Sequence, residues 1–211
     1  MTCLCPTKNR RRWLPLAIEC FRKQTYPNRE LLIVADGENV RDIATGNDIH
    51  FVEIEPGRNI GEKRNFGCAM ARGEFIAHWD DDDYSAPGRI ADQVGRLKDS
   101  GLAVTAYDSM YFGDAAGAWW HYQGKMTGIG TSLVYRKDWW AGHKFPAKPV
   151  CEDSEFMYAA LRDKQIITAP AGLLMAATIH ERNTSKRTLG DSRYKRQPEF
   201  AGVPGMRWPC D

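Results

Sequence analysis

The sequence predicts one α/β domain built on a mostly parallel central sheet with helices on both faces. Two observations support this prediction. Over residues 1–100, short apolar runs that suit buried strands alternate with segments whose apolar residues recur every three or four positions, as on one helix face. The length of 211 residues, with 43% hydrophobic and 27% charged residues, fits a single globular domain.

The first elements follow from this alternation. Residues 2–5 form the first expected strand, which a turn at residues 6–9 ends. The apolar run at residues 31–35 is typical of an inner parallel strand, and residues 49–54 form a third. Between the first two strands we expect a helix, because five apolar residues share one face. These residues are Trp13, Leu16, Ala17, Cys20 and Phe21.

The next elements lead to the most distinctive feature of the sequence. Residues 62–72 predict a helix, and residues 74–79 predict a fourth strand that ends directly in four aspartates, Asp80–Asp83. Pro87 is placed to begin another helix, and residues 102–107 form a fifth strand. Since ligands bind beyond the carboxyl ends of parallel strands, we expect the loops after the first, second and fourth strands to share one rim.

The second half of the chain has a weaker pattern. Residues 110–125 are rich in glycine and aromatic residues. A helix is expected at residues 152–163, and strands are expected at residues 131–136, 165–169 and 173–179. From residue 181 onward the chain is polar, carries seven Lys/Arg against four Asp/Glu, and contains three prolines. We therefore expect residues 181–211 to be a basic, loop-like tail.

Net charge, hydropathy and cysteine spacing limit the classes of protein that this sequence can belong to. The net charge of +2 is too small to imply a polyanionic partner by itself. No apolar stretch is long enough to cross a membrane, so we expect no membrane span. The six cysteines show no metal-ligand spacing, and no secretory leader pattern follows Met1. We therefore expect a cytoplasmic protein without disulfides.

The four aspartates need a source of positive charge. Like charges side by side repel unless solvent or a cation relieves the repulsion. Carboxylate oxygens suit Mg²⁺ or Mn²⁺. The alternative is a solvated acidic loop that caps the helix beginning near Pro87, while a calcium loop of the EF-hand type lacks its central Gly and terminal Glu. The position at the carboxyl rim of the sheet favours a metal site.

Several ordered motifs resemble those of glycosyltransferase family 2, an inverting family with the Rossmann-like GT-A fold. The segment 79–87 resembles its DxD motif, in which Asp-x-Asp-Asp follows an apolar strand and precedes a proline. Residues 61–67 and 71–77 resemble the helix and strand before that motif, and residues 5–10 and 32–37 its two nucleotide-binding loops. Ala35 stands where the family usually has an acid. The likeness is continuous over residues 2–100.

The resemblance implies roles for residues of the first half. Asp36 would accept hydrogen bonds from the nucleobase, Arg64 would line the nucleoside pocket, and Asp82 would hold a metal bridging the donor diphosphate. Read alone, Asp36 also suits a turn, and Arg64 a solvent-facing helix position. The implied donor-binding residues are Thr7, Asn9, Arg10, Asp36, Arg64, Asp80 and Asp81. The implied metal ligands are Asp82, Asp83 and His180, although a lone His after an apolar strand also suits a capped strand end.

Residues 101–180 would form the acceptor and catalytic half of a single domain over residues 1–180, and residues 1–100 the donor half. The segment 151–156 resembles the family's Glu-Asp motif, so Asp153 is expected to be the catalytic base and Glu152 to position the base or the acceptor. The alternative is that these acids stabilise a helix N-terminus. The expected acceptor-side residues are Gly130, Thr131, Trp119 and Trp120, although paired tryptophans usually serve packing.

The resulting prediction is a metal-dependent inverting, hexosyltransferase-like enzyme that uses Mn²⁺ or Mg²⁺ and a nucleoside-diphosphate sugar, with a UDP-sugar favoured. The acceptor would be a glycan, a protein or a hydroxymethylated DNA base, which the basic tail would help to bind. A sugar nucleotidyltransferase is the first alternative, but residues 5–10 contain no glycine for its usual loop. The second alternative is a non-catalytic module that binds nucleotide sugars.

Overall fold

The computed structural model describes residues 1–124, 127–184 and 188–206. Its helices are α1 (Leu14–Arg22), α2 (Ile60–Met70), α3 (Arg89–Ser100), α4 (Lys137–Gly142) and α5 (Glu152–Arg162), with a 3-10 turn η1 (Gly130–Ser132). Its strands are β1 (Thr2–Thr7), β2 (Glu30–Ala35), β3 (Ile49–Glu53), β4 (Phe75–His78), β5 (Tyr84–Ser85), β6 (Val104–Asp114), β7 (Trp119–Gln123), β8 (Val134–Arg136), β9 (Ile166–Pro170), β10 (Met175–Ile179) and β11 (Tyr194–Arg196).

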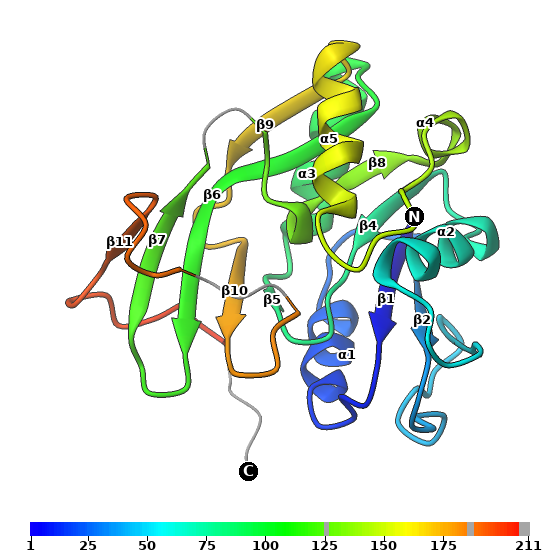
Figure 1. Cartoon of the computed structure of the whole chain (residues 1–211), viewed down its shortest axis with the longest axis horizontal. Coiled ribbons are helices and arrows are strands. Elements are labelled where there is room, and N and C mark those ends of the chain that lie inside the picture. The colour runs from blue at the N-terminus through cyan, green and yellow to red at the C-terminus, as the bar shows by residue number, and fades with distance from the viewer. Residues whose placement is uncertain (125–126, 185–187, 207–211) are drawn as a thin grey trace.

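One mixed sheet runs through the molecule in the order β11-β7-β6-β8-β4-β1-β2-β3, with β5, β9 and β10 joined to its side (Figure 1). Strand β1 pairs in parallel with β2 and β4, and β2 with β3. Beyond β4 the sheet is mixed, because β8 is antiparallel to both β4 and β6. The predicted α/β class with a mostly parallel core is therefore confirmed.

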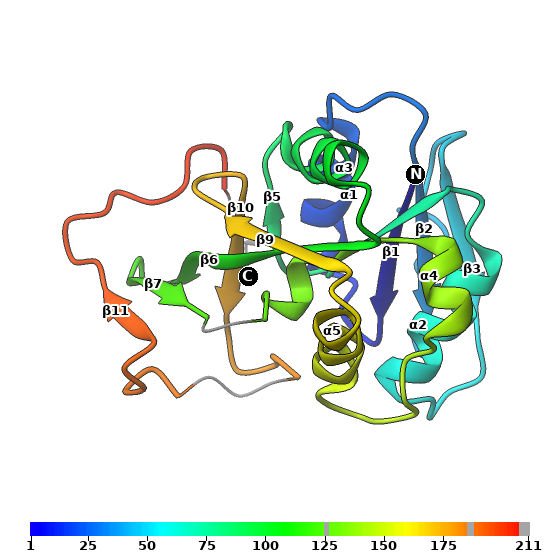
Figure 2. The same cartoon turned by 90° about the horizontal axis from the view of Figure 1, so that it is seen from above.

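Helices cover both faces of the sheet, with α1 and α3 on one side and α2 and α5 on the other (Figure 2). Successive side chains of a strand point to opposite faces, so β1 contributes to two separate cores. Cys3 and Cys5 pack with Phe21 of α1 and Val94 of α3. Leu4 instead packs in the cluster that includes residues of α2 and α5. This two-sided burial explains the continuous apolar runs of the first strands.

Two local features move element boundaries from their expected places. Helix α2 begins at Ile60 because Asn59 forms a capping box with Glu62: Asn59 Oδ1 accepts from Glu62 N at 3.0 Å, and Glu62 Oε2 accepts from Asn59 N at 2.9 Å. The strand expected at residues 131–136 is divided into η1 and the short strand β8. The boundaries differ and the two-residue strand β5 was not expected, but the other elements of the first half follow in the expected order.

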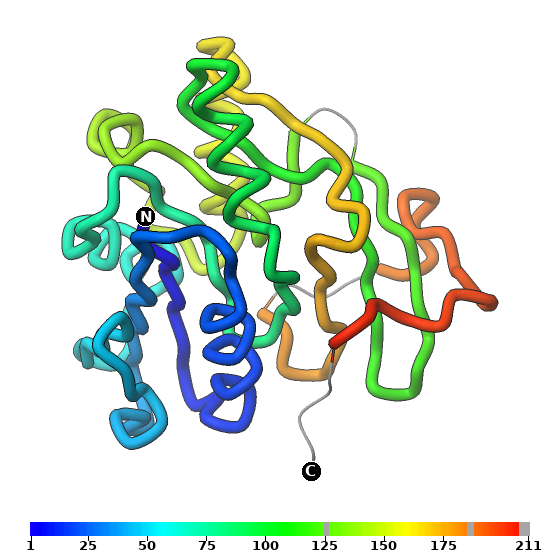
Figure 3. Tube along the Cα trace, turned by 180° about the vertical axis from the view of Figure 1, so that it is seen from behind, coloured from blue at the N-terminus to red at the C-terminus, as the bar shows by residue number. Residues whose placement is uncertain are grey.

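The segment expected to be a loop-like tail contributes to the sheet. Residues 194–196 form β11, which pairs antiparallel with β7. Farther along, Phe200 stacks on Tyr111 with ring centroids 4.1 Å apart, and Val203 is buried. Figure 3 shows this segment crossing the β6–β7 hairpin. Periodicity in the sequence could not reveal so short an edge strand. Residues 185–187 and 207–211 of the expected tail lie outside the described residues.

None of the helices within the described ranges is long and apolar enough to cross a membrane.

Candidate functional site

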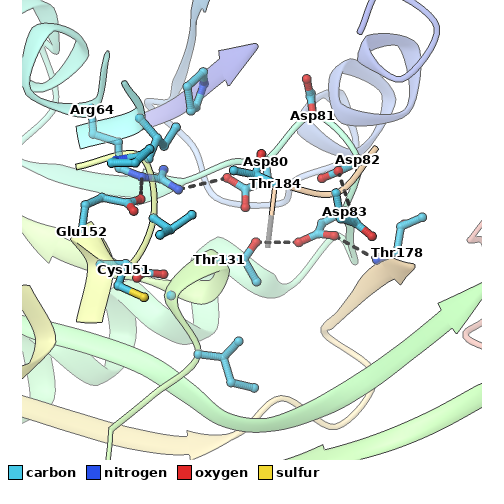
Figure 4. Close-up of a pocket in the computed structure, with 18 of the residues that line it drawn as sticks. Arg64, Asp80, Asp81, Asp82, Asp83, Thr131, Cys151, Glu152, Thr178 and Thr184 are labelled. Carbon is cyan, nitrogen blue, oxygen red and sulfur yellow. Dashed lines mark hydrogen bonds and ion pairs between the residues drawn. The ribbon is translucent and has the colours of Figure 1, made fainter. Parts of the chain in front are cut away.

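A polar cleft lies at the carboxyl ends of β1 and β4, where the strand order predicts a ligand site (Figure 4). The aspartates Asp80–Asp83 follow β4 and form its floor, and η1 and the start of α5 border it. Residues distant in sequence therefore meet in one space. The polar residues of its lining are Arg10, Arg64, Asp80, Asp81, Asp82, Asp83, Thr131, Glu152, Asp153, Thr178, Asn183 and Thr184.

Asp83 is an internal anchor for the cleft. Its Oδ2 accepts a hydrogen bond from Thr131 Oγ1 at 2.5 Å, and its Oδ1 accepts one from the backbone N of Thr178 at 3.0 Å. Burial and the neighbouring charge of Asp82 raise the pKa of Asp83 to about 8. Since both carboxylate oxygens already have protein donors, Asp83 ties the loop of residues 80–83 to η1 and to β10.

Asp82 is the aspartate on which most cationic and polar donors converge. Its Oδ2 lies 2.8 Å from Arg10 Nη1, 2.9 Å from His180 Nε2 and 3.3 Å from Asn183 Nδ2. The imidazole of His180 also stacks on Trp13, with ring centroids 4.2 Å apart. The structure thus brings two of the three expected metal ligands, Asp82 and His180, into direct contact.

Asp81 contacts the same nitrogen of Arg10 as Asp82 does. Its Oδ2 accepts from Thr7 Oγ1 at 2.6 Å, and its Oδ1 lies 3.0 Å from Arg10 Nη1. Burial and the charge of Asp82 raise the pKa of Asp81 to about 7, and Arg10 and Thr7 oppose this rise. Arg10 thereby compensates two adjacent carboxylates at once.

Arg64 joins the aspartate loop to the start of α5. Its Nε donates to Glu152 Oε1 at 3.0 Å, and its Nη2 lies 3.4 Å from Asp80 Oδ1 (Figure 4). Burial opposes the charged form, but Asp80 and Glu152 raise the pKa of Arg64 overall. Burial also raises the pKa of Glu152, while Arg64 opposes the rise. Arg64 Nη1 has no hydrogen-bond partner among the described residues, so it remains able to donate to a ligand in the cleft.

Asp153 follows Glu152 in the chain, and only one oxygen of its carboxylate accepts hydrogen bonds from described residues. The hydrogen bonds it accepts from described residues, from Ser154 N at 2.7 Å and Ser154 Oγ at 3.3 Å, both reach Oδ1. Its Oδ2 lies against Gly130, where a β-carbon would be 1.5 Å away. Glu152 is buried and paired, whereas Asp153 is only half buried and faces the cleft.

The two loops expected to bind a nucleoside are also in contact. Asp36, which is fully buried, forms an ion pair with Lys63 of α2, and its Oδ2 lies 3.5 Å from Lys8 Nζ. Asn9 Oδ1 accepts from Glu38 N at 3.0 Å and so joins the loop after β1 to the loop after β2. Lys63 was not expected here, because a lysine beside Arg64 on a helix has no distinguishing sequence pattern.

The expected acceptor-side residues divide into two groups. Gly130 and Thr131 line the cleft, but Trp119 and Trp120 do not. Trp119 is buried in the core beside Phe200, with ring centroids 5.4 Å apart. Trp120 is half buried on the opposite face of β7. Trp13 and Asn183, which contact His180, were also not expected at the site, because they become its neighbours only through folding.

The donor atoms present fit a metal ion that is shared with a substrate. Within the described ranges, no three His, Cys, Asp or Glu side chains form a group that could hold a metal by themselves. Asp82 and His180 nevertheless offer one carboxylate and one imidazole at the same point. Mn²⁺ accepts both kinds of ligand, and phosphate oxygens and water commonly complete such sites.

Comparison with known families defines the class of protein. The model of the family "Glycosyl transferase family 2" matches residues 2–158, and the chain belongs to this family. One relative of this chain is EpsH of Bacillus subtilis (strain 168), which is named as a glycosyltransferase. EpsH is 25% identical to this chain over 182 residues. That match covers 73% of this chain and 52% of EpsH, so the chain spans about half the length of this curated relative.

Two solved structures share the fold. Residues 1–349 of S. aureus TarS in complex with UDP-GlcNAc have a TM-score of 0.70 at 18% identity, covering 87% of this chain and 59% of that one. The mannosyltransferase PcManGT from Pyrobaculum calidifontis, in complex with GDP-Man and Mn²⁺, has a TM-score of 0.68 at 16% identity, covering 87% and 58%. At these identities the likeness concerns the fold alone.

Proposed function

We propose that this protein is a metal-dependent, inverting glycosyltransferase that moves a sugar from a nucleoside-diphosphate sugar to an acceptor hydroxyl. The observation that carries the proposal is the composition of one cleft. Arg64 and Asp82 provide a place for a diphosphate and its cation, and Asp153 presents a carboxylate to the same space. The donors bound in TarS and PcManGT support a nucleotide sugar as the donor here.

Asp36 and Lys63 favour a uridine or guanosine donor. An ionised carboxylate only accepts hydrogen bonds and an ammonium only donates them, so Asp36 and Lys63 together suit a base edge with a ring N–H group beside a carbonyl. Uracil and guanine have such a group, whereas cytosine and adenine do not. Lys63 is placed to donate to the neighbouring base carbonyl. Asp36 is fully buried and paired with Lys8 and Lys63, so these lysines must move before a base can reach it. We favour a UDP-sugar, since uracil is the smaller base and requires less movement.

Asp82 and His180 are the proposed metal ligands, because their side chains meet and Asp83 uses both its oxygens internally. A bound Mn²⁺ or Mg²⁺ neutralises the charge that develops on the departing diphosphate. Arg64 supplements this charge through its unpartnered Nη1. Arg10 Nη1 lies 2.8 Å from Asp82 Oδ2, so Arg10 would be free to contact the diphosphate if a cation were held by Asp82 in its place.

Asp153 is the proposed catalytic base, and Glu152 is a positioning residue. The acceptor oxygen attacks the anomeric carbon, and the bond from that carbon to the diphosphate oxygen breaks with its electron pair leaving on the nucleoside diphosphate. Asp153 takes the acceptor proton, so a hydroxyl and a sugar phosphate become a glycoside and a diphosphate. Glu152 holds Arg64 at 3.0 Å and therefore cannot approach the acceptor without breaking a buried pair.

The test is calorimetric binding of UDP, GDP, CDP and ADP, each with Mn²⁺ and with EDTA. We expect UDP to bind only with Mn²⁺, and Asp82→Ala to abolish this binding. Asp99→Ala is the matched control, because Asp99 is an exposed acid at the end of α3. Absence of diphosphate binding under every condition would refute the proposal. Binding without release of UDP from any UDP-sugar would indicate a non-catalytic module.

A further inference from the structure

A second cavity continues from the candidate active site into the other half of the domain. It shares Ile129, Gly130, Cys151 and Asp153 with the cleft described above. From there it extends between α5 and the strands β6, β7 and β11, which lie on the side of the molecule away from β1–β3 (Figure 1). Asp153 therefore stands at the junction of the two spaces, and none of the proposed donor-binding residues lines the second one.

Aromatic rings form the sheet side of this cavity. Phe112, Tyr122 and Tyr194 project from three adjacent strands, with ring centroids 4.7 to 5.6 Å apart. The strand register explains the grouping, because Tyr122 of β7 is paired directly with Tyr194 of β11. The edge strand β11, which the sequence did not reveal, thus completes an aromatic wall.

Helix α5 supplies the opposite side, beginning at the proposed base. Ser154, which directly follows Asp153, and Tyr158 are four residues apart and so lie on one helix face. The Tyr158 side chain is 59% exposed, which is unusual for a large aromatic residue within a cavity lining. An exposed aromatic ring in a concave site is typical of a binding surface.

The charges of this cavity do not suit a polyanion. Of the described residues that line it, Asp153 and Arg193 carry formal charges. Arg193 is already compensated, since its Nη2 and Nε lie 2.7 and 3.0 Å from the oxygens of Asp191. A nucleic acid would need uncompensated cations along its path. Aromatic faces with hydroxyl groups between them instead suit the C–H faces and hydroxyls of sugars.

We propose that this cavity, which we name the aromatic groove, binds the end of a neutral saccharide acceptor, with sugar rings against Tyr158 and Tyr122. The bound sugar places one hydroxyl at Asp153, and the Thr127 hydroxyl lies in the same lining. The Tyr122 hydroxyl accepts from Arg193 Nη1 and can still donate, and the Ser154 hydroxyl donates to Asp153 Oδ1 and can still accept. This inference rests on the proposed function, because it treats Asp153 as the base. It selects a glycan over the modified DNA base that the sequence left open.

The test uses an array of defined neutral and anionic oligosaccharides, together with a DNA duplex containing 5-hydroxymethylcytosine, in the presence of UDP and Mn²⁺. We expect the wild-type protein to retain neutral oligosaccharides, and Tyr158→Ala to weaken this binding about tenfold or more. Tyr158→Phe keeps the ring and should bind within about threefold of wild type. Phe66→Ala is the matched control, because Phe66 is an exposed aromatic residue on α2 outside the groove.

Calorimetry with UDP on the same variants separates this inference from the proposed function. If UDP binds equally to wild type and Tyr158→Ala, and only the variant loses saccharide binding, the groove assignment and the proposed function are both supported. If UDP binds but no neutral saccharide does, or if Tyr158→Ala retains saccharides as wild type does, the groove assignment is wrong and the proposed function stands. Salt-sensitive binding of the DNA above every saccharide would also overturn it. Saccharide binding lost in Tyr158→Ala without any UDP binding would support the groove and refute the donor site.

Discussion

Gly130 and Asp153 are packed so closely that a side chain at position 130 would collide with the carboxylate of Asp153. A β-carbon there would lie 1.5 Å from Asp153 Oδ2 and 2.3 Å from its Cγ. The backbone cannot move away freely, because the carbonyl oxygen of Gly130 is bound to His78 Nδ1 at 2.8 Å. The missing side chain of Gly130 therefore creates the space in which the carboxylate of Asp153 lies.

Gly130→Ala should displace the Asp153 carboxylate and reduce turnover by about 10² or more, as loss of a general base does. UDP affinity should change little, because the donor-binding residues are untouched. The measurement is UDP release from a UDP-sugar, together with UDP binding. Gly95→Ala is the control, since a β-carbon at Gly95 meets nothing within 4 Å and should stabilise α3 by about 0.5–1 kcal/mol. Wild-type turnover in Gly130→Ala would contradict the assignment of the base.

Asp153→Asn and Glu152→Gln should have different consequences. Asp153→Asn should lower turnover by about 10²–10⁴ with unchanged UDP affinity, since an amide cannot accept the acceptor proton. Glu152→Gln should reduce turnover less but destabilise the protein by about 1–3 kcal/mol, because Arg64 loses a buried charged partner. Turnover and chemical denaturation measured on both variants test this. The reverse pattern would make Glu152 the base.

Arg10→Gln should tighten Mn²⁺ binding in the absence of nucleotide by about tenfold, a difference of about 1.4 kcal/mol. The reason is that the guanidinium occupies Asp82 Oδ2 at 2.8 Å and so competes with a cation. Arg11→Gln is the control, because the exposed Arg11 pairs with Asp42 away from the cleft. Calorimetric titration with Mn²⁺ measures the effect, and unchanged or weaker Mn²⁺ binding in Arg10→Gln would count against Asp82 as a ligand.

His78 should make stability depend on pH below about 6.5. Burial first, and Arg64 next, hold the pKa of His78 well below its usual value, and its Nε2 has no partner among the described residues. As pH falls below about 6.5, this histidine is protonated in the unfolded chain but stays neutral in the folded protein. The free energy of unfolding therefore falls, by about 1.4 kcal/mol per pH unit from this group. Denaturation of wild type and His78→Asn at pH 7.5 and 5.5 should show a smaller loss in the variant. His121→Asn, at a half-buried site, should lose as much as wild type; equal losses in all three proteins would refute the role of His78.

Trp119→Ala should destabilise the protein by about 3–5 kcal/mol, because it empties a buried site in the core. Trp120→Ala should cost much less, since Trp120 is only half buried. Neither variant should weaken UDP binding. Chemical denaturation and UDP titration measure these effects, and a larger loss of stability in Trp120→Ala would show that the two side chains are assigned to the wrong environments.

Local sequence patterns were sufficient for the first half of the fold. Continuous apolar runs predicted β1, β2 and β4, because a strand buried on both faces has no polar alternation. The position of the four aspartates directly after β4 predicted a site at the carboxyl rim, and the cleft lies there. These features depend on residues that are adjacent in the chain, and so they can be read without knowing the tertiary structure.

Only the tertiary structure decided which contacts each aspartate of the cleft makes. Identical aspartates at positions 82 and 83 differ because one faces Arg10 and His180, while the other is held by Thr131 and Thr178. The pairing of β11 with β7 was equally hidden, because an edge strand of three residues has too few side chains to show a period. Contacts between residues about 50 to 100 positions apart arise from packing of whole elements, and no local pattern encodes them.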